Sequence, residues 1–251
     1  MNMTEHAQLR EPKTHLGTWL TIGSPVIAEL AAEVGLDWLL IDLEHGCGSE
    51  AALFPQLQAI RNAGTAAIVR VGAPHPDLIL RALDWGADGI MVPHVSSPAE
   101  AEACVQAAHY PPRGRRGVSR SARAYGYGLR WPADPTALPA PLLMAQIETI
   151  EGVEQAPAIA RADGIDVLFV GPADLNFDLQ ARPALAVHTY EGCLQRVAAA
   201  AAEAGKACGI LVRSAADLQA VQALGYRWLA MGSDLALLRE GFRQIVGKTK
   251  P

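Results

Sequence analysis

The chain has 251 residues, half of them apolar, and a formal net charge of −5. That length suits one large core and is close to the roughly 250 residues of a typical α/β barrel. The charges form no basic patch, which argues against a nucleic-acid-binding protein. The longest apolar runs are only as long as strands, so we expect no membrane span, and the polar N-terminus lacks the apolar segment of a secretory signal.

The four cysteines are widely spaced and form no CxxC pair (Cys47, Cys104, Cys193, Cys208). This spacing argues against a zinc site and against a disulfide framework. We expect reduced, mostly buried thiols, as in a cytoplasmic protein.

Apolar runs typical of buried strands alternate along the chain with alanine- and leucine-rich segments of helical spacing. The runs predict eight strands, at 16–22, 38–43, 66–71, 89–93, 142–147, 166–170, 207–212 and 227–231. Helices are predicted at 25–34, 50–63, 98–109, 190–204 and 215–224. Serines precede three of these helices (Ser24, Ser97, Ser214), and glycines follow four of them (Gly35, Gly64, Gly205, Gly225). Eight strands with helices between them favour a closed barrel. We therefore predict an α/β fold, a single (β/α)8 TIM barrel that forms one domain over residues 1–251.

Residues 111–141 break this alternation with six prolines and six arginines. The segment predicts a long loop between the fourth helix and the fifth strand, and loops of that length in compact domains are usually functional or mobile. Two interpretations stay open. The loop is either a lid or subunit contact that attracts an anionic substrate, or a solvated segment whose arginines pair with surface carboxylates.

Two carboxylates stand at the C-terminal ends of neighbouring predicted strands, which meet on the catalytic face of a barrel. Glu148 follows the fifth strand and Asp174 follows the sixth. Together they could hold a divalent cation, with Mg²⁺ or Mn²⁺ best suited to oxygen ligands and Co²⁺ or Zn²⁺ possible. Alternatively, Asp174 caps a short helix and Glu148 pairs with an arginine. An arginine and a histidine at other strand ends favour the metal site.

Arg70 closes the third predicted strand, and His45 follows the second. A guanidinium in that position suits a carboxylate or a developing oxyanion, and a histidine suits general acid–base work. Arg70 could instead form an ion pair with Glu44 or Asp42, and His45 could be a structural residue. His94 is interpreted as such a structural histidine, with no catalytic role.

No lysine stands at the C-terminal end of a predicted strand, where a Schiff-base aldolase or a pyridoxal-phosphate enzyme needs one. The sequence also contains no P-loop and no GxGxxG motif, so neither PLP nor NAD is expected. The turn MGSD at 231–234 suits a helix cap better than a phosphate site.

Several motifs resemble, in order, those of the HpcH/HpaI aldolase family: GTWLTIGSPVIAELAAEVGLDWLLIDLEHG, IVRVG, LDWGADGIMVPHV, YPPRGRRGVS, MAQIETIEGVE and FVGPADL. The resemblance covers about residues 15–245. It implies a metal-dependent class II aldolase that acts on 2-oxo acids, such as 4-hydroxy-2-oxoheptanedioate or 2-keto-3-deoxy sugar acids, and that is a homohexamer.

The resemblance also implies roles for individual residues. Glu148 and Asp174 are metal ligands, Arg70 contacts the 2-oxo oxygen and the enolate, and His45 belongs to the acid–base machinery. Asp42 and Asp84 support the histidine. Trp19, Gln146, Gly171, Pro172 and Ala173 line the pyruvate pocket. Because Asp84 lies near the end of a helix that runs away from the catalytic face, we expect a neighbouring subunit to supply it. Alternatively, Asp84 is a structural residue that pairs with Arg81 or caps a turn.

The sequence thus predicts a carbon–carbon lyase that cleaves the C3–C4 bond of a 4-hydroxy-2-oxo acid through a pyruvate-type enolate. The expected partners are a small 2-oxo acid, an aldehyde and further copies of the chain, with neither nucleic acid nor membrane. Two alternatives stay open: a CoA-thioester lyase of the citrate lyase β or malyl-CoA type, and a catalytically silent barrel subunit.

Overall fold

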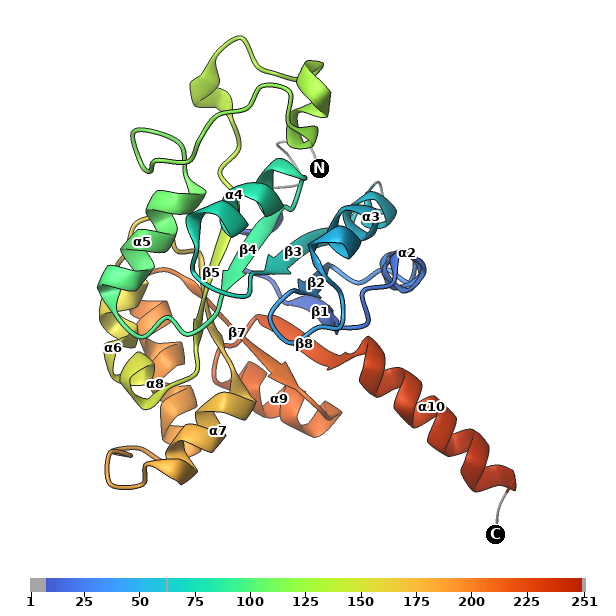
Figure 1. The fold of residues 1–251 in the computed structure, drawn as a ribbon. Coiled ribbons are helices and arrows are strands. Elements are labelled where there is room, and N and C mark those ends of the chain that lie inside the picture. The colour runs from blue at the N-terminus through green and yellow to red at the C-terminus, as the bar shows by residue number, and fades with distance from the viewer. Residues whose placement is uncertain (1–7, 62, 250–251) are drawn as a thin grey trace.

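The computed structural model, which describes residues 8–61 and 63–249, contains a closed barrel of eight parallel strands paired in sequence order (Figure 1). The strands are β1 (His15–Leu20), β2 (Trp38–Asp42), β3 (Ala66–Arg70), β4 (Gly89–Val92), β5 (Leu142–Ile147), β6 (Val167–Val170), β7 (Ala207–Val212) and β8 (Trp228–Ser233). The predicted (β/α)8 TIM barrel is confirmed.

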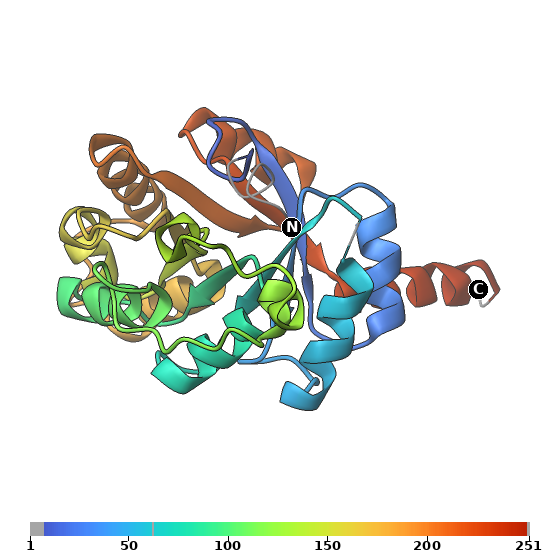
Figure 2. The same ribbon diagram turned by 90° about the horizontal axis from the view of Figure 1, so that it is seen from above.

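Helices follow the strands and form a ring around most of the barrel (Figure 2). They are α2 (Pro25–Glu33), α3 (Glu50–Ile60), α4 (Pro76–Asp84), α5 (Pro98–Ala108), α6 (Ile150–Ala160), α7 (Pro172–Ala181), α8 (Tyr190–Glu203), α9 (Ala215–Ala223) and α10 (Asp234–Thr249). The expected serine caps of α2, α5 and α9 accept backbone hydrogen bonds. The glycines predicted to end helices all adopt positive φ angles, as such positions require.

Two apolar clusters hold the barrel together. One lies inside it, where Trp38 contacts the rings of Trp19, Phe169 and Trp228. The other lies between the strands and the helices and includes Leu39, which alternates with Trp38 along β2. Because the strands are buried on both faces, they are nearly continuous apolar runs in the sequence.

A buried aspartate links the segment after the first strand to the last helix. Asp234, the first residue of α10, accepts hydrogen bonds from the backbone of Thr21 and Ile22. This contact explains why β1 ends at Leu20 rather than at residue 22, since the next two N–H groups bind a side chain instead of a strand. The oxygen of Ser233 accepts from Ala236 in the first turn of α10, so the MGSD turn caps a helix as predicted.

The long segment between α5 and β5 contains two short 3₁₀ helices, Arg123–Gly128 and Pro135–Ala137, and lies at one end of the molecule (Figure 1). The predicted strand ends lie within two residues of the observed ones. The predicted helix at 50–63 was too long, since α3 ends at Ile60. Of the described residues, no helix is long and apolar enough to cross a membrane.

The four cysteines are free thiols in the described structure, with Cys47 exposed and the other three buried. This confirms the expectation of unpaired, mostly buried thiols. Burial raises the pKa of the Cys104 thiol to about 12, so that side chain is a protonated packing residue.

Candidate active site

The candidate residues gather at the C-terminal end of the barrel, as predicted. Asp42 ends β2, Arg70 ends β3 and Glu148 directly follows β5. Asp174 lies in the first turn of α7, which begins just after β6. Four separate strands therefore bring these charged groups to the face that carries catalysis in such barrels.

Arg70 is held by two carboxylates. Its Nε and Nη2 atoms donate to the two oxygens of Asp42 at 2.9 and 2.8 Å, and its Nη1 atom lies 2.8 Å from a Glu44 oxygen. Burial alone would lower the pKa of Arg70, but the hydrogen bonds and charges of these acids outweigh it, so the pKa is raised. The ion-pair alternative considered from the sequence is thus confirmed. An arginine has five N–H groups, so donors remain for a ligand.

Glu148 is a carboxylate that is only 2% exposed. Its Oε1 atom accepts from the backbone N–H of His94 at 2.7 Å, and its Oε2 atom accepts from Gln146 at 2.6 Å. Burial is the largest cause of a raised pKa, and the negative charges of Asp174 and Glu44 add to it, while His94 opposes it. Among the described residues, no arginine forms an ion pair with Glu148, so the alternative proposed for this residue is not seen there.

Asp174 is half-buried, and its side chain forms no hydrogen bond or ion pair with any residue in 8–61 or 63–249. It therefore does not cap α7, although its charge is close enough to raise the pKa of Glu148. Within the same ranges, no three Asp, Glu, His or Cys side chains are grouped tightly enough to hold a metal ion. Any cation here would have two protein carboxylates and would keep positions for water or substrate.

The surroundings of Glu148 fit a cation with oxygen ligands. The side-chain oxygen of Gln146 is buried and has no hydrogen-bond partner. Gly171 allows the Glu148 carboxylate to lie close against the backbone, because a Cβ atom added there would lie 2.3 Å from its Oε2 atom. Among the described residues, the carboxylates of Glu148 and Asp174 and the side-chain oxygen of Gln146 form a site whose negative charge a divalent cation would neutralise.

His94, interpreted from the sequence as a structural histidine, lies among the candidate residues. Its ring lies between two acids, with Nδ1 3.1 Å from Glu148 and Nε2 3.2 Å from Glu44. Its φ angle is +55°, which is uncommon for residues other than glycine. Residues with such strained backbone conformations are often found at functional sites. Its place directly after β4, on the catalytic face, was the available signal.

His45 and Trp19 complete the neighbourhood. The His45 ring is 64% exposed and lies 3.9 Å from a Glu44 oxygen. Asp42 supports this histidine through the backbone, accepting from its N–H at 3.3 Å, rather than through the ring. Trp19 is buried, with its ring 5.8 Å from the Arg70 guanidinium carbon.

The remaining candidates differ in position. Gly171, Pro172 and Ala173 form the start of α7 beside Glu148. Asp84 ends α4 and pairs with Arg116 at 2.7 Å, not with Arg81 as the alternative held. Arg81 pairs with Glu50 instead.

Comparison with known proteins gives matches over nearly the whole chain. A 5-keto-4-deoxy-D-glucarate aldolase of Salmonella arizonae is 34% identical over 242 residues, covering 96% of this chain and 94% of that protein. A hydroxypyruvate/pyruvate aldolase of Delftia acidovorans is 36% identical over 250 residues, covering 96% and 90%. The crystal structure of an HpcH/HpaI aldolase/citrate lyase family protein from Burkholderia cenocepacia has a TM-score of 0.91, with 34% identity and 100% of both chains covered.

The barrel and these likenesses define an enzyme of the aldolase type, a carbon–carbon lyase. The sequence pattern of the HpcH/HpaI aldolase/citrate lyase family matches residues 15–241, and the chain belongs to that family. The family resemblance inferred from the motifs is confirmed.

Proposed function

We propose that the chain is a metal-dependent class II aldolase that cleaves, and in reverse forms, the C3–C4 bond of a 4-hydroxy-2-oxo acid. The observation that carries this proposal is the buried Glu148 beside the unpartnered Asp174, on the same barrel face as Arg70. Substrate and products are small molecules, a 2-oxo acid and an aldehyde.

Glu148 and Asp174 would hold the divalent cation, Mg²⁺ or Mn²⁺ by preference for oxygen ligands. When bound, the cation supplies Lewis acidity to the keto group of the substrate. Glu148 would bind the cation through its Oε2 atom, which accepts only one hydrogen bond, from Gln146. Its Oε1 atom already lies next to the backbone N–H and the ring of His94.

Arg70 would stabilise the charge that cleavage creates. When the C4 hydroxyl loses its proton, the C3–C4 electron pair remains with C3 as a pyruvate enolate, and an aldehyde leaves. The enolate oxygen is negative, and a guanidinium fixed in advance by Asp42 and Glu44 needs little reorganisation to donate to it. Trp19, Gln146 and the start of α7 would form the walls around the 2-oxo acid.

His45 would move the proton of the C4 hydroxyl. Its ring is exposed at the mouth of the site, so a water molecule can relay the proton between substrate and imidazole. In the synthetic direction the same histidine would return the proton to the new alkoxide.

The first prediction tests the proposed chemistry directly. Cleavage of a panel of 4-hydroxy-2-oxo acids, measured as pyruvate by coupling to lactate dehydrogenase, should stop in EDTA. It should return with added Mg²⁺, Mn²⁺, Co²⁺ or Zn²⁺. Undiminished cleavage in EDTA, a borohydride-trapped adduct, or cleavage of a malyl-CoA-type thioester alone would contradict the proposal.

The second prediction concerns His94, which lies between Glu148 and Glu44. His94→Asn should raise the Mn²⁺ concentration that gives half-maximal activity by about 10-fold, because residues that orient a metal ligand have effects of that order. Asparagine tolerates the positive φ angle, so the backbone can stay in place. The matched control is His188→Asn, since His188 lies 3.2 Å from Glu154 outside the site. An unchanged Mn²⁺ dependence of His94→Asn would show that the histidine does not position Glu148.

We also propose that the chain functions as a homo-oligomer. α10 extends away from its own barrel in both views (Figures 1 and 2). It exposes Leu235, Leu238 and Phe242, whose spacing places them along one stripe of the helix. The other helices lie against the strands that they follow, whereas α10 does not. In a dimer, each copy could bind the α10 helix of the other, and the apolar stripe of each helix would then be covered.

The third prediction asks whether Asp84 acts across subunits. A mixture of Asp84→Asn and His45→Ala proteins, dissociated and reassembled, should regain activity that neither protein has alone. Assembly of hybrids is checked by native mass spectrometry of differently tagged subunits. Hybrids without activity would mean that Asp84 has a structural role, in its ion pair with Arg116, and does not act across subunits.

A further inference from the structure

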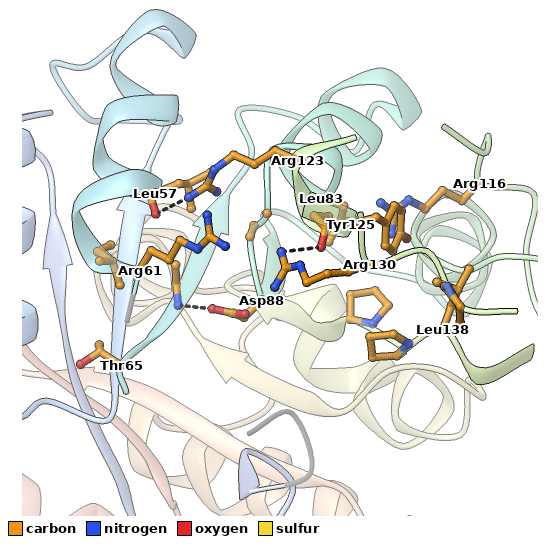
Figure 3. Close-up of a pocket in the computed structure, with 18 of the residues that line it drawn as sticks. Leu57, Arg61, Thr65, Leu83, Asp88, Arg116, Arg123, Tyr125, Arg130 and Leu138 are labelled. Atoms are coloured by element: carbon orange, nitrogen blue, oxygen red, sulfur yellow. Dashed lines mark hydrogen bonds between the residues drawn. The ribbon is translucent and has the colours of Figure 1, made fainter. Parts of the chain in front are cut away.

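A cavity of about 440 Å³ lies at the end of the barrel opposite the candidate active site. Its wall includes Ala67 in the first half of β3, Asp88 just before β4 and Pro141 just before β5, whereas the catalytic groups stand at the other ends of the strands. The segment 111–141 closes its outer side (Figure 3). This volume is in the range of sites for small ligands.

The cavity is lined by four arginines and one aspartate, namely Arg61, Arg116, Arg123, Arg130 and Asp88. Only Arg116 has a carboxylate partner, Asp84, among the described residues. Arg61, Arg123 and Arg130 form no ion pair with any residue in the described ranges. The labelled side chains of these three face the same space in Figure 3. The described residues that line the cavity therefore carry more positive than negative charge.

Arg123 is the fixed part of this cluster. It is 8% exposed and donates to the carbonyl oxygens of Leu57 in α3 and of Trp85 at the end of α4. Those partners are neutral, so they orient the guanidinium without neutralising it. Burial is the largest cause of its lowered pKa, and the charges of Arg61 and Arg130 lower the pKa further, while Tyr127 and Asp88 oppose this effect. A buried cation repelled by two others is stabilised by an anion between them.

The cavity also has features of a built site. Arg116 is only 7% exposed, and its Nε–H group is buried without a hydrogen-bond partner. Two glycines leave room for guanidinium groups: a Cβ atom at Gly86 would lie 2.7 Å from Arg123, and one at Gly126 would lie 2.8 Å from Arg130. Both glycines have positive φ angles, so the turns that carry them also favour glycine.

We propose that this cavity is a second binding site, separate from the catalytic one, for a small organic anion with two or more carboxylate or phosphate groups. Guanidinium groups bind both kinds of oxyanion through paired N–H donors. The apolar wall formed by Leu57, Ile60, Leu83 and Leu138 accommodates the carbon skeleton of such a ligand. Arg61 and Arg130, which are exposed, admit it from solvent, and Arg123 anchors it.

The test is calorimetric titration of the full-length protein, in EDTA and at constant ionic strength, with two probes. Inorganic pyrophosphate represents phosphate groups and tricarballylate represents carboxylates. Wild-type protein should bind at least one of them saturably, and the better probe identifies the group. The variant Arg61→Gln/Arg130→Gln should bind about 10-fold more weakly, since each substitution removes a charge-assisted contact. Both arginines lack ion pairs in the described structure, so this variant should fold and retain aldol cleavage.

The matched control is Arg161→Gln/Lys206→Gln, which removes two positive charges near the same end of the barrel but outside the cavity. It should bind the probe like the wild type. Absence of saturable binding to the wild type would overturn the proposal, as would equal weakening in both double variants. A change of oligomeric mass in Arg61→Gln/Arg130→Gln with unchanged probe affinity would also overturn it, and would assign the cluster to a subunit contact.

Discussion

Arg70→Lys should lower the turnover of aldol cleavage roughly 100-fold, equivalent to about 3 kcal/mol of transition-state stabilisation, while the protein remains folded. Lysine keeps the positive charge but not the planar set of donors. In the wild type, one guanidinium satisfies both oxygens of Asp42, reaches Glu44 and still has N–H groups to offer an enolate. One ammonium group cannot serve these partners together.

The measurement is steady-state cleavage with circular dichroism and urea unfolding of the same preparations. The matched control is Arg10→Lys, because Arg10 binds both oxygens of Asp166 at 2.9 and 3.0 Å outside the catalytic face. The Arg10→Lys variant should lose a bidentate ion pair comparable to that of Arg70 with Asp42, with little loss of turnover. Turnover near the wild-type level in folded Arg70→Lys would mean that Arg70 serves only to neutralise Asp42 and Glu44.

The fold was predictable because the barrel strands are buried on both faces, which leaves apolar runs such as Trp38–Asp42 visible in the sequence. The end of each run then located Arg70, Glu148 and Asp174 on one face. α4, α6, α7 and α10 received no predicted ranges. α6 contains Pro157, and α7 has few apolar residues in a helical pattern.

The contacts that the sequence could not reveal are those between distant segments. His94 bridges Glu148 and Glu44 only because the loops after β2, β4 and β5 converge. Arg123 reaches carbonyl oxygens 38 and 66 residues away. Neither interpretation of the 111–141 loop included the hydrogen bonds of Arg123 to carbonyl oxygens. The ion pair of Arg113 with Asp163 fits the interpretation in which arginines of the loop pair with surface carboxylates.

Gly171→Ala should also reduce turnover about 100-fold, through the position of Glu148 rather than through folding. The backbone at Gly171 has a φ angle of −88°, which suits alanine, so no backbone strain is expected. The new methyl group, however, would lie 2.3 Å from the Glu148 Oε2 atom and 2.8 Å from the Gln146 nitrogen. Glu148 must then move by about 1 Å, and a displacement of that size at a catalytic centre can cost 100-fold in rate.

Two measurements separate this effect from a general loss of structure. Because a displaced carboxylate binds a cation more weakly, a higher Mn²⁺ concentration should restore part of the turnover of Gly171→Ala, whereas an unfolded protein would not respond. The control Gly241→Ala adds the same methyl group in α10, outside the stripe of Leu235, Leu238 and Phe242 and with nothing within 4 Å of it. It should leave oligomeric mass, turnover and Mn²⁺ dependence unchanged. Full activity of Gly171→Ala at low Mn²⁺ would mean that catalysis does not depend on the present position of the Glu148 carboxylate. The absence of a side chain at position 171 would then have no bearing on a cation site.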